Sequence, residues 1–297
     1  MDYQWYPGHM TKARRMMQEN IQLIDLLIEL TDARAPQAGR NPDIDTLAKG
    51  KSRIVVLNKA DLADADATKK WCGFFEEKGF LTAQIDSRKG SGVRQLKPLI
   101  DKACAEKIER NKRRGIVNRP VRAMIAGIPN VGKSTFINSF AGRAAAKTGD
   151  KPGVTKGKQW IRLNKNVELL DTPGILWPKF DDQEIGKKLA LIGSIRDEIT
   201  DAQELAVWLI RYLEKEYPDV LENRYQLSQI EDKTDVTAII GIARDQEVDQ
   251  AVKTLGQIAL RRGCLKAGGE ADPEKAAKTL IDDFRSGRLG TITLEKV

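Results

Sequence analysis

Short apolar runs, each followed by turn residues, recur along the first part of the chain and predict six β-strands. Stretches with the helical spacing of apolar residues separate most of these runs. This alternation is typical of a mostly parallel sheet with helices on both faces. The last two runs are joined by three residues only, which predicts an antiparallel hairpin. The predicted strands are residues 24–30, 53–57, 81–85, 121–126, 159–163 and 167–170.

After about residue 180 the pattern changes to helices alone. Three amphipathic stretches follow, and two of them begin at an aspartate suited to cap a helix: residues 201–217, 246–263 and 272–287. A chain of 297 residues is long enough for two domains. We therefore expect an α/β domain over 1–180 and an all-helical domain over 181–297.

Residues 127–134, with the sequence GIPNVGKS, follow a predicted strand and open a predicted helix. This is the setting of a P-loop, in which glycines let backbone N–H groups approach phosphates and the helix N-terminus adds positive charge. Lys133 is then expected to reach the β- and γ-phosphates and to act in catalysis, and the Ser134 hydroxyl to ligate Mg²⁺. The predicted nucleotide contacts here are Asn130, Val131, Gly132, Lys133, Ser134 and Thr135.

Two further motifs fit the γ-phosphate side of the same site. The sequence DTPG follows the last predicted strand, and Asp171 within it fits the acidic residue that holds Mg²⁺. The backbone N–H of Gly174 can meet the γ-phosphate, which makes the following loop sensitive to hydrolysis. Between the P-loop and DTPG, Thr155 supplies the hydroxyl expected of a switch loop that closes over Mg²⁺ and takes part in catalysis.

The sequence NKAD, formed by Asn58, Lys59, Ala60 and Asp61, ends the second predicted strand and specifies the base. A carboxylate at Asp61 accepts hydrogen bonds from guanine N1–H and the 2-amino group, a donor pair that adenine lacks. Lys59 can lay its stem over the ring, and Asn58 can tie this loop to the P-loop. Together with the phosphate motifs, NKAD predicts a GTP site.

The base-reading motifs precede the phosphate-binding motifs along the chain. After the third predicted strand comes DSRKG, in which Asp86 and Ser87 are expected to support the base. In the ordinary GTPase order the P-loop strand comes first and the NKxD strand fifth. A site depends on which strands are neighbours in space, so cutting one loop and joining the old ends preserves it. The order NKAD, DSR, P-loop, switch threonine and DTPG therefore predicts a circularly permuted P-loop GTPase domain.

The net charge of +8 is unevenly spread. Residues 1–180 hold 33 Lys and Arg against 19 Asp and Glu, whereas 181–297 hold 17 against 23. A basic first domain points to a polyanionic partner. No apolar run reaches the length of a membrane span and no signal-peptide core is present, so we expect a cytoplasmic protein without membrane contact. The three isolated cysteines are expected to be buried, reduced thiols.

In combination these motifs make the chain similar to the circularly permuted GTPases of ribosome assembly, and in particular to the ribosome biogenesis GTPase A (YlqF) family. The resemblance covers essentially the whole chain and includes WYPGHMTKA at 5–13, DARAPQAGRNP at 32–42 and RRGCLKAGG at 261–269. It implies a GTP hydrolase that acts in late maturation of the large (50S) ribosomal subunit. The implied partners are GTP and GDP, the large subunit with its rRNA and the ribosomal proteins near the contact, but not DNA.

The position after DTPG, where many GTPases carry a water-orienting glutamine, is Ile175. Unaided hydrolysis is therefore expected to be slow and to be stimulated by the ribosomal subunit. Asn130 resembles the asparagine of potassium-activated GTPases, which implies K⁺ as an activator ligated there. His9, the only histidine of the chain, is a candidate for orienting the attacking water, with a packing role as the alternative.

Two other interpretations stay open on the sequence. In the first, the chain is an RNA-binding assembly scaffold that GTP orders and in which hydrolysis is incidental. In the second, it is a permuted GTPase of small-subunit assembly. Relatives of that type usually carry a zinc-binding Cys/His cluster, which this sequence lacks.

Overall fold

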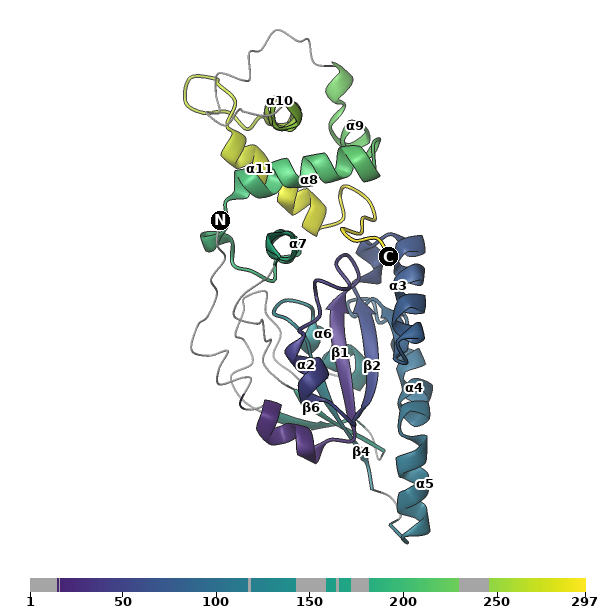
Figure 1. Cartoon of the computed structure of the whole chain (residues 1–297). Coiled ribbons are helices and arrows are strands. Elements are labelled where there is room, and N and C mark those ends of the chain that lie inside the picture. Colours follow the sequence, from purple (N-terminus) through teal and green to yellow (C-terminus); the bar gives the residue numbers. More distant parts are fainter. Residues whose placement is uncertain are drawn as a thin grey trace. The chain divides into compact units, whose positions relative to one another are not determined.

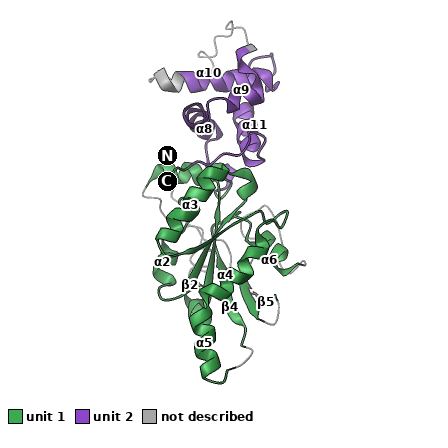
Figure 2. Ribbon diagram, turned by 90° about the vertical axis from the view of Figure 1, so that its right-hand side faces the viewer, with its two compact units in different colours: residues 1–194, 295–297 green, residues 195–294 purple. Residues whose placement is uncertain are grey.

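The computed structural model of the protein describes residues 15, 17–116, 119–142, 159–163, 166–171, 182–229 and 246–297. The chain forms two compact units, residues 1–194 with 295–297 and residues 195–294 (Figure 2). The first unit holds the sheet, and the described part of the second unit contains helices. The domain boundary predicted at residue 180 lies outside the described residues.

The sheet has six strands in the order β3-β2-β1-β4-β6-β5; β1, β2, β4 and β6 are labelled in Figure 1. All neighbouring strands are parallel except β5 and β6, which form the predicted antiparallel hairpin. The prediction of a six-stranded, mostly parallel sheet is confirmed. The strands are β1 (Leu26–Asp32), β2 (Ser52–Asn58), β3 (Leu81–Ile85), β4 (Val121–Ala126), β5 (Gln159–Arg162) and β6 (Val167–Asp171).

The central strand β1 begins and ends two residues later than predicted. Its pairing with β2 continues to Asp32, which lies opposite Asn58. All of its residues are buried, because a strand lies on either side and helices cover both faces. The extension places Asp32 at the carboxyl edge of the sheet, directly beside the NKAD sequence.

One face of the sheet carries an apolar cluster shared with the N-terminal segment and α2 (Asp43–Leu47): Met17, Ile24, Leu27, Ile44, Ala48, Met124, Ala126 and Leu170. Toward the β3 edge, α3 (Ala65–Glu77) packs Trp71 and Phe75 against β2. On the other face α4 (Leu96–Ala103) contacts β2 and β3. Figures 1 and 2 show α6 (Lys133–Ala141) on the opposite side of the sheet from α2.

The connection from β3 to β4 links the strands that lead to the base-reading motifs with the strand that leads to the P-loop. It forms α4 and α5 (Ala105–Arg113), which meet at Cys104, where φ is −108° and ψ is 7°. Burial raises the pKa of this thiol to about 11. The last turn of α5 is basic, with Arg110, Lys112 and Arg113. All three cysteines are buried and free.

The second unit is built from α8 (Ala202–Glu216), α9 (Val220–Tyr225), α10 (Gln246–Arg261) and α11 (Pro273–Arg285). The predicted caps are present, because Asp201 and Asp272 accept hydrogen bonds from first-turn amides of α8 and α11. Asp283 of α11 is fully buried and accepts from Arg224 Nε at 2.8 Å and from the Tyr225 hydroxyl at 3.0 Å. These bonds tie α9 to α11. Among the described residues, no helix is long and apolar enough to cross a membrane.

Candidate nucleotide-binding site

The strand order reverses between β1 and β4, which are neighbours at the centre of the sheet. In the sheet, β2 and then β3 lie on one side of β1, whereas β6 and then β5 lie on the far side of β4. In open parallel sheets, ligands bind outside the carboxyl ends of the strands at such a reversal. The loops at 33–41, 59–64 and 127–132 follow β1, β2 and β4, and therefore gather at this edge.

The P-loop holds its lysine inside the loop. Lys133 is buried, and its Nζ donates to the carbonyl oxygens of Gly127 at 3.1 Å and Ile128 at 2.9 Å. The residue opens α6, so the first amides of the helix face the loop. A phosphate in the loop offers anionic oxygens to the ammonium group in place of two neutral carbonyls. The geometry is therefore that of an anion-binding loop.

Position 132 of the P-loop requires a glycine because Asn58 of the NKAD sequence lies against it. Its φ is 96°, and a Cβ atom there would lie 2.5 Å from Asn58 Nδ2. A side chain would thus be strained in its backbone and would collide with the NKAD sequence. The glycine of one motif is fitted to the asparagine of the other.

Asn58 joins three of the predicted motifs. Its side chain is buried, and Nδ2 donates to the Val131 carbonyl at 2.7 Å. Its Oδ1 accepts from the Ser87 amide at 3.2 Å and from the Ser87 hydroxyl at 2.8 Å. The predicted tie between NKAD and the P-loop is present, across 73 positions of the sequence. Ser87 acts on the base loop through Asn58.

Lys59 makes a second link between the two motifs. Its Nζ donates to the Asn130 carbonyl at 2.9 Å and pairs with Asp32 Oδ2 at 2.9 Å. The residue takes a left-handed conformation with φ 58°. Burial lowers the pKa of its ammonium group, and the Asp32 carboxylate opposes that effect. With its head fixed in this way, the aliphatic stem of Lys59 is held at the edge of the sheet.

Asp32 and Arg34 belong to the site although the sequence analysis gave them no role. Asp32 Oδ1 accepts from the Arg34 amide at 3.1 Å and from its Nε at 2.9 Å, and Oδ2 accepts from its Nη2 at 2.8 Å. Burial acts to raise the pKa of Asp32, but Arg34 and Lys59 hold it far below its usual value. The sequence carries a signal for this, since DAR begins with the last residue of β1 just as NKAD begins with the last residue of β2.

Asp61 stands at the end of the base-reading motif. With Ala60 it opens a short 3₁₀ turn, and it is exposed to solvent there. Asp86, by contrast, is buried, and its Oδ1 accepts from the amides of Arg88 at 2.8 Å and Lys89 at 3.1 Å. Its contacts shape the DSRKG loop. Of these two carboxylates, that of Asp61 is the one exposed to solvent.

The residues predicted to hold Mg²⁺ come from neighbouring strands. Ser134 follows β4 as the second residue of α6, and Asp171 is the last residue of β6, which pairs with β4. Hydroxyl and carboxylate oxygens are the hard ligands that Mg²⁺ takes beside phosphate oxygens, so these residue types fit the ion. Thr135 is the next residue of α6. His9, Thr155 and Gly174 lie outside the described residues.

The P-loop is also bound to the end of the segment that leads toward the second unit. Asn130, at φ 59°, donates from Nδ2 to the Gly193 carbonyl at 2.7 Å. The Ser194 hydroxyl donates to the Pro129 carbonyl at 2.9 Å. The amide of Asn130 is therefore oriented by the residues that follow α7 (Gln183–Leu191).

Comparison with protein families identifies the class of this site. Residues 122–244 match the family model described as "50S ribosome-binding GTPase". Ribosome biogenesis GTPase A of Bacillus cereus is 45% identical over 295 residues, which is 99% of this chain and 94% of that protein. Ribosome biogenesis GTPase A of Thermotoga maritima is 31% identical over 293 residues, which is 98% of this chain and 94% of that protein.

Solved structures agree with the sequence comparison. GNP-bound YlqF from Thermotoga maritima has a TM-score of 0.62 at 28% identity, over 96% of this chain and 98% of that one. A GDP-bound YlqF has a TM-score of 0.61 at 27% identity, over 94% and 98%. The similarity therefore extends over both units of the chain.

Proposed function

The chain belongs to the ribosome biogenesis GTPase A family, and we propose that it acts in late assembly of the large (50S) ribosomal subunit. As a member of this family it is a circularly permuted GTPase of ribosome biogenesis, which binds GTP and GDP and hydrolyses GTP with Mg²⁺. In the proposal, the GTP form binds pre-ribosomal particles through rRNA and the ribosomal proteins near the contact. Hydrolysis then releases it.

The observation that carries the choice of subunit is the match of residues 122–244 to a family described as binding the 50S ribosome. The basic first domain supports an rRNA contact, because phosphate neutralisation by Lys and Arg supplies most non-specific affinity for nucleic acid. In the second unit, Arg285 pairs with Asp197 and Arg288 pairs with Asp283, so carboxylates already offset these two charges. The better candidate for binding rRNA phosphates is the last turn of α5, with Arg110, Lys112 and Arg113.

We assign the nucleotide to the carboxyl edge of the sheet. Guanine is placed on the Asp61 carboxylate, the β- and γ-phosphates on Lys133, and Mg²⁺ on Ser134, Thr155 and Asp171. When bound, Mg²⁺ neutralises charge on the phosphates. The further proposed contacts are Asn58, Lys59, Ala60, Asp86, Ser87, Asn130, Val131, Gly132, Thr135 and Gly174.

Hydrolysis in this proposal is slow without the particle, since Ile175 cannot orient water. Asn130 is the proposed K⁺ ligand through its amide oxygen. Its amide nitrogen is bound to Gly193, which supports this orientation. His9 is proposed to position the attacking water when the ribosomal particle repositions its segment.

Isolated subunits test the proposal directly. We expect large subunits to raise GTP turnover at least about tenfold in K⁺ buffer, because the particle completes a site that lacks its glutamine. Small subunits should leave the turnover unchanged, and replacing K⁺ with Na⁺ should reduce the stimulated rate. Equal stimulation by both subunits, or by small subunits alone, would exclude the large-subunit assignment.

The same assay separates the two roles of His9. His9→Ala should lower the turnover stimulated by large subunits and leave the Kd for GTP unchanged, because the imidazole is assigned to water and not to the nucleotide. Turnover at the wild-type level would remove His9 from the mechanism.

We further propose that the nucleotide state sets the orientation of the two units. The chain passes between the units at 194–195 and at 294–295, and both points are anchored to loops of the nucleotide edge. Ser194 is bonded to the P-loop, and the Glu295 carboxylate accepts from the amides of Gln37 at 2.7 Å and Ala38 at 3.1 Å. Small-angle scattering should therefore differ between the GTP-analogue and GDP forms. Identical profiles would contradict this coupling.

A further inference from the structure

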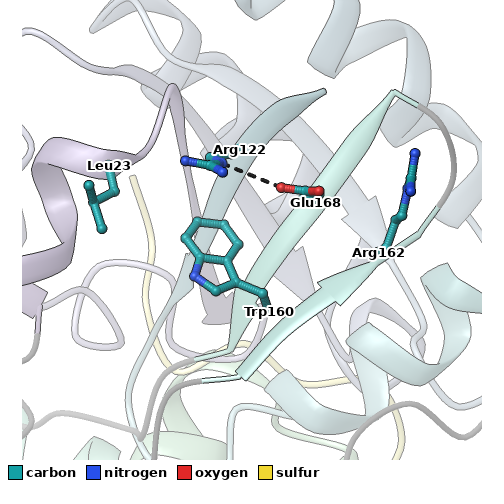
Figure 3. A pocket seen from close by; sticks show the side chains of 5 residues that line it. All are labelled: Leu23, Arg122, Trp160, Arg162 and Glu168. Atoms are coloured by element: carbon teal, nitrogen blue, oxygen red, sulfur yellow. Dashed lines mark hydrogen bonds and ion pairs between the residues drawn. The ribbon is translucent and has the colours of Figure 1, made fainter. Parts of the chain in front are cut away.

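A pocket on the first unit lies apart from the nucleotide edge. It has a volume of about 320 Å³ and is lined by Leu23, Arg122, Trp160, Arg162 and Glu168 (Figure 3). Arg122 and Glu168 are the second residues of β4 and β6, whereas the P-loop follows the far end of β4. The pocket therefore lies at the opposite end of β4 from the P-loop.

Strand register brings the polar and aromatic side chains of this pocket together. Arg122 pairs in register with Glu168, and Glu168 with Arg162, across three adjacent strands. Trp160 lies two residues from Arg162, so both side chains leave the same face of β5. Arg122 Nε is 3.4 Å from Glu168 Oε2, and a dashed line in Figure 3 marks this ion pair.

Trp160 presents an aromatic surface at the edge of the sheet. The residue is 37% exposed, which is high for so large an apolar residue. The guanidinium carbon of Arg122 lies 5.3 Å from the centre of its ring. The planar cation of Arg122 thus lies over one face of the indole in an open pocket, and both groups stack on flat π systems.

Further cationic side chains lie around the residues that precede β1, next to Leu23 in the sequence. Asp25 accepts from the Arg122 amide at 3.0 Å and pairs with Arg119 at 3.7 Å and with Lys107. Lys51 Nζ donates to the carbonyl of Ile24 at 2.9 Å. Burial and the charge of Lys107 lower the pKa of Lys51, as expected where cations gather. A polyanion following this rim meets several positive charges around one carboxylate.

We propose that this pocket binds an unpaired segment of RNA, with one base stacked on Trp160 and the neighbouring phosphates on the surrounding cations. Aromatic platforms beside positive side chains are the means by which proteins hold single-stranded nucleic acid. An acidic protein surface would use the cations but would gain nothing from the indole face. The inference rests on the proposed function, because it names the kind of rRNA segment that the chain contacts.

The role of the Trp160 indole in RNA binding is tested with full-length protein and a fluorescein-labelled oligouridylate. An oligonucleotide of about ten nucleotides is within the usual site size of proteins that bind single strands. Fluorescence anisotropy should give a Kd about tenfold weaker for Trp160→Ala and for Trp160→Leu, which keeps apolar volume without a π face. Trp160→Phe should stay within about threefold of the wild type, because phenylalanine still stacks. Wild-type affinity in all three variants, or equal loss in all three, would overturn the proposal.

The cations are tested by a matched pair of charge removals. Arg162→Gln should weaken oligouridylate binding and flatten its salt dependence, whereas Lys278→Gln, an exposed lysine of α11, should change neither. Polyglutamate of equal charge should compete poorly. If it displaces the RNA as well as unlabelled oligouridylate does, the pocket is an acid-binding surface and the proposal fails.

Failure of this inference and failure of the proposed function give different results. The oligouridylate assay needs no ribosomal particle, and the Trp160 variants should keep the wild-type intrinsic GTP turnover. Loss of RNA binding in Trp160→Ala without any stimulation by large subunits would refute the function and keep the pocket. Stimulation by large subunits with unchanged RNA binding in Trp160→Ala would refute the RNA-binding pocket and keep the proposed function.

Discussion

Asp61→Asn should weaken GTP binding at least about 100-fold, or ~3 kcal/mol, and should make the protein bind XTP instead. The carboxylate of Asp61 is placed to accept from guanine N1–H and the 2-amino group. An amide there directs its own N–H toward the 2-amino group, so a donor meets a donor. Xanthine carries a carbonyl oxygen at position 2, which accepts from the amide nitrogen. Isothermal titration calorimetry with both nucleotides measures the exchange.

The chain offers a matched control for this substitution. Asp66 is an exposed aspartate in the first turn of α3, five residues after Asp61. Asp66→Asn changes the net charge equally and should leave both affinities at their wild-type values. If Asp61→Asn keeps the wild-type preference for GTP over XTP, the base is not read at this position.

Asp32→Asn should destabilise the first unit by about 3–5 kcal/mol, the cost of removing one partner of a buried ion pair. Asp32 and Arg34 have side chains 1% and 2% exposed, so the guanidinium would remain buried without its countercharge. Lys59 would lose its carboxylate as well, and GTP affinity should fall because the lysine stem is no longer held. Urea unfolding, followed by circular dichroism, measures the change in the free energy of unfolding.

Asp45 provides the comparison for Asp32. It also pairs with two arginines, Arg40 and Arg53, but its side chain is 52% exposed. Arg40 and Arg53 also pair with the buried Glu29, so neither guanidinium would be left without a carboxylate. Asp45→Asn should therefore cost less than about 1 kcal/mol. Equal losses in the two variants would show that burial of the Asp32 pair does not matter.

The six strands could be predicted from the sequence because each apolar run is short and ends in turn residues. That the NKAD and P-loop sequences meet at one edge of the sheet also followed from the motifs, since the two serve one nucleotide only when their strands end at the same edge. The direct bonds of Asn58 and Lys59 to the P-loop agree with this placement. Local signals were sufficient for these features.

Other features depend on contacts that no local pattern encodes. Glu29 lies in the central strand, fully buried, where it pairs with Arg40 and Arg53. Its sequence neighbours are apolar, so only the register of β1 and β2 reveals the partner Arg53. Glu295 binds the amides of the loop after β1 from 257 and 258 positions away. Periodicity within a short window carries no information on such pairs.

A crystal structure with Mg²⁺ and a non-hydrolysable GTP analogue would show whether the NKAD and P-loop sequences bind one nucleotide although their order along the chain is exchanged. We expect a single analogue molecule, with guanine N1 and the 2-amino nitrogen about 2.7–3.2 Å from the Asp61 carboxylate oxygens. In the same molecule, phosphate oxygens should replace the carbonyls of Gly127 and Ile128 as partners of Lys133 Nζ. Phosphates bound at Lys133 with the base held away from Asp61 would contradict the account.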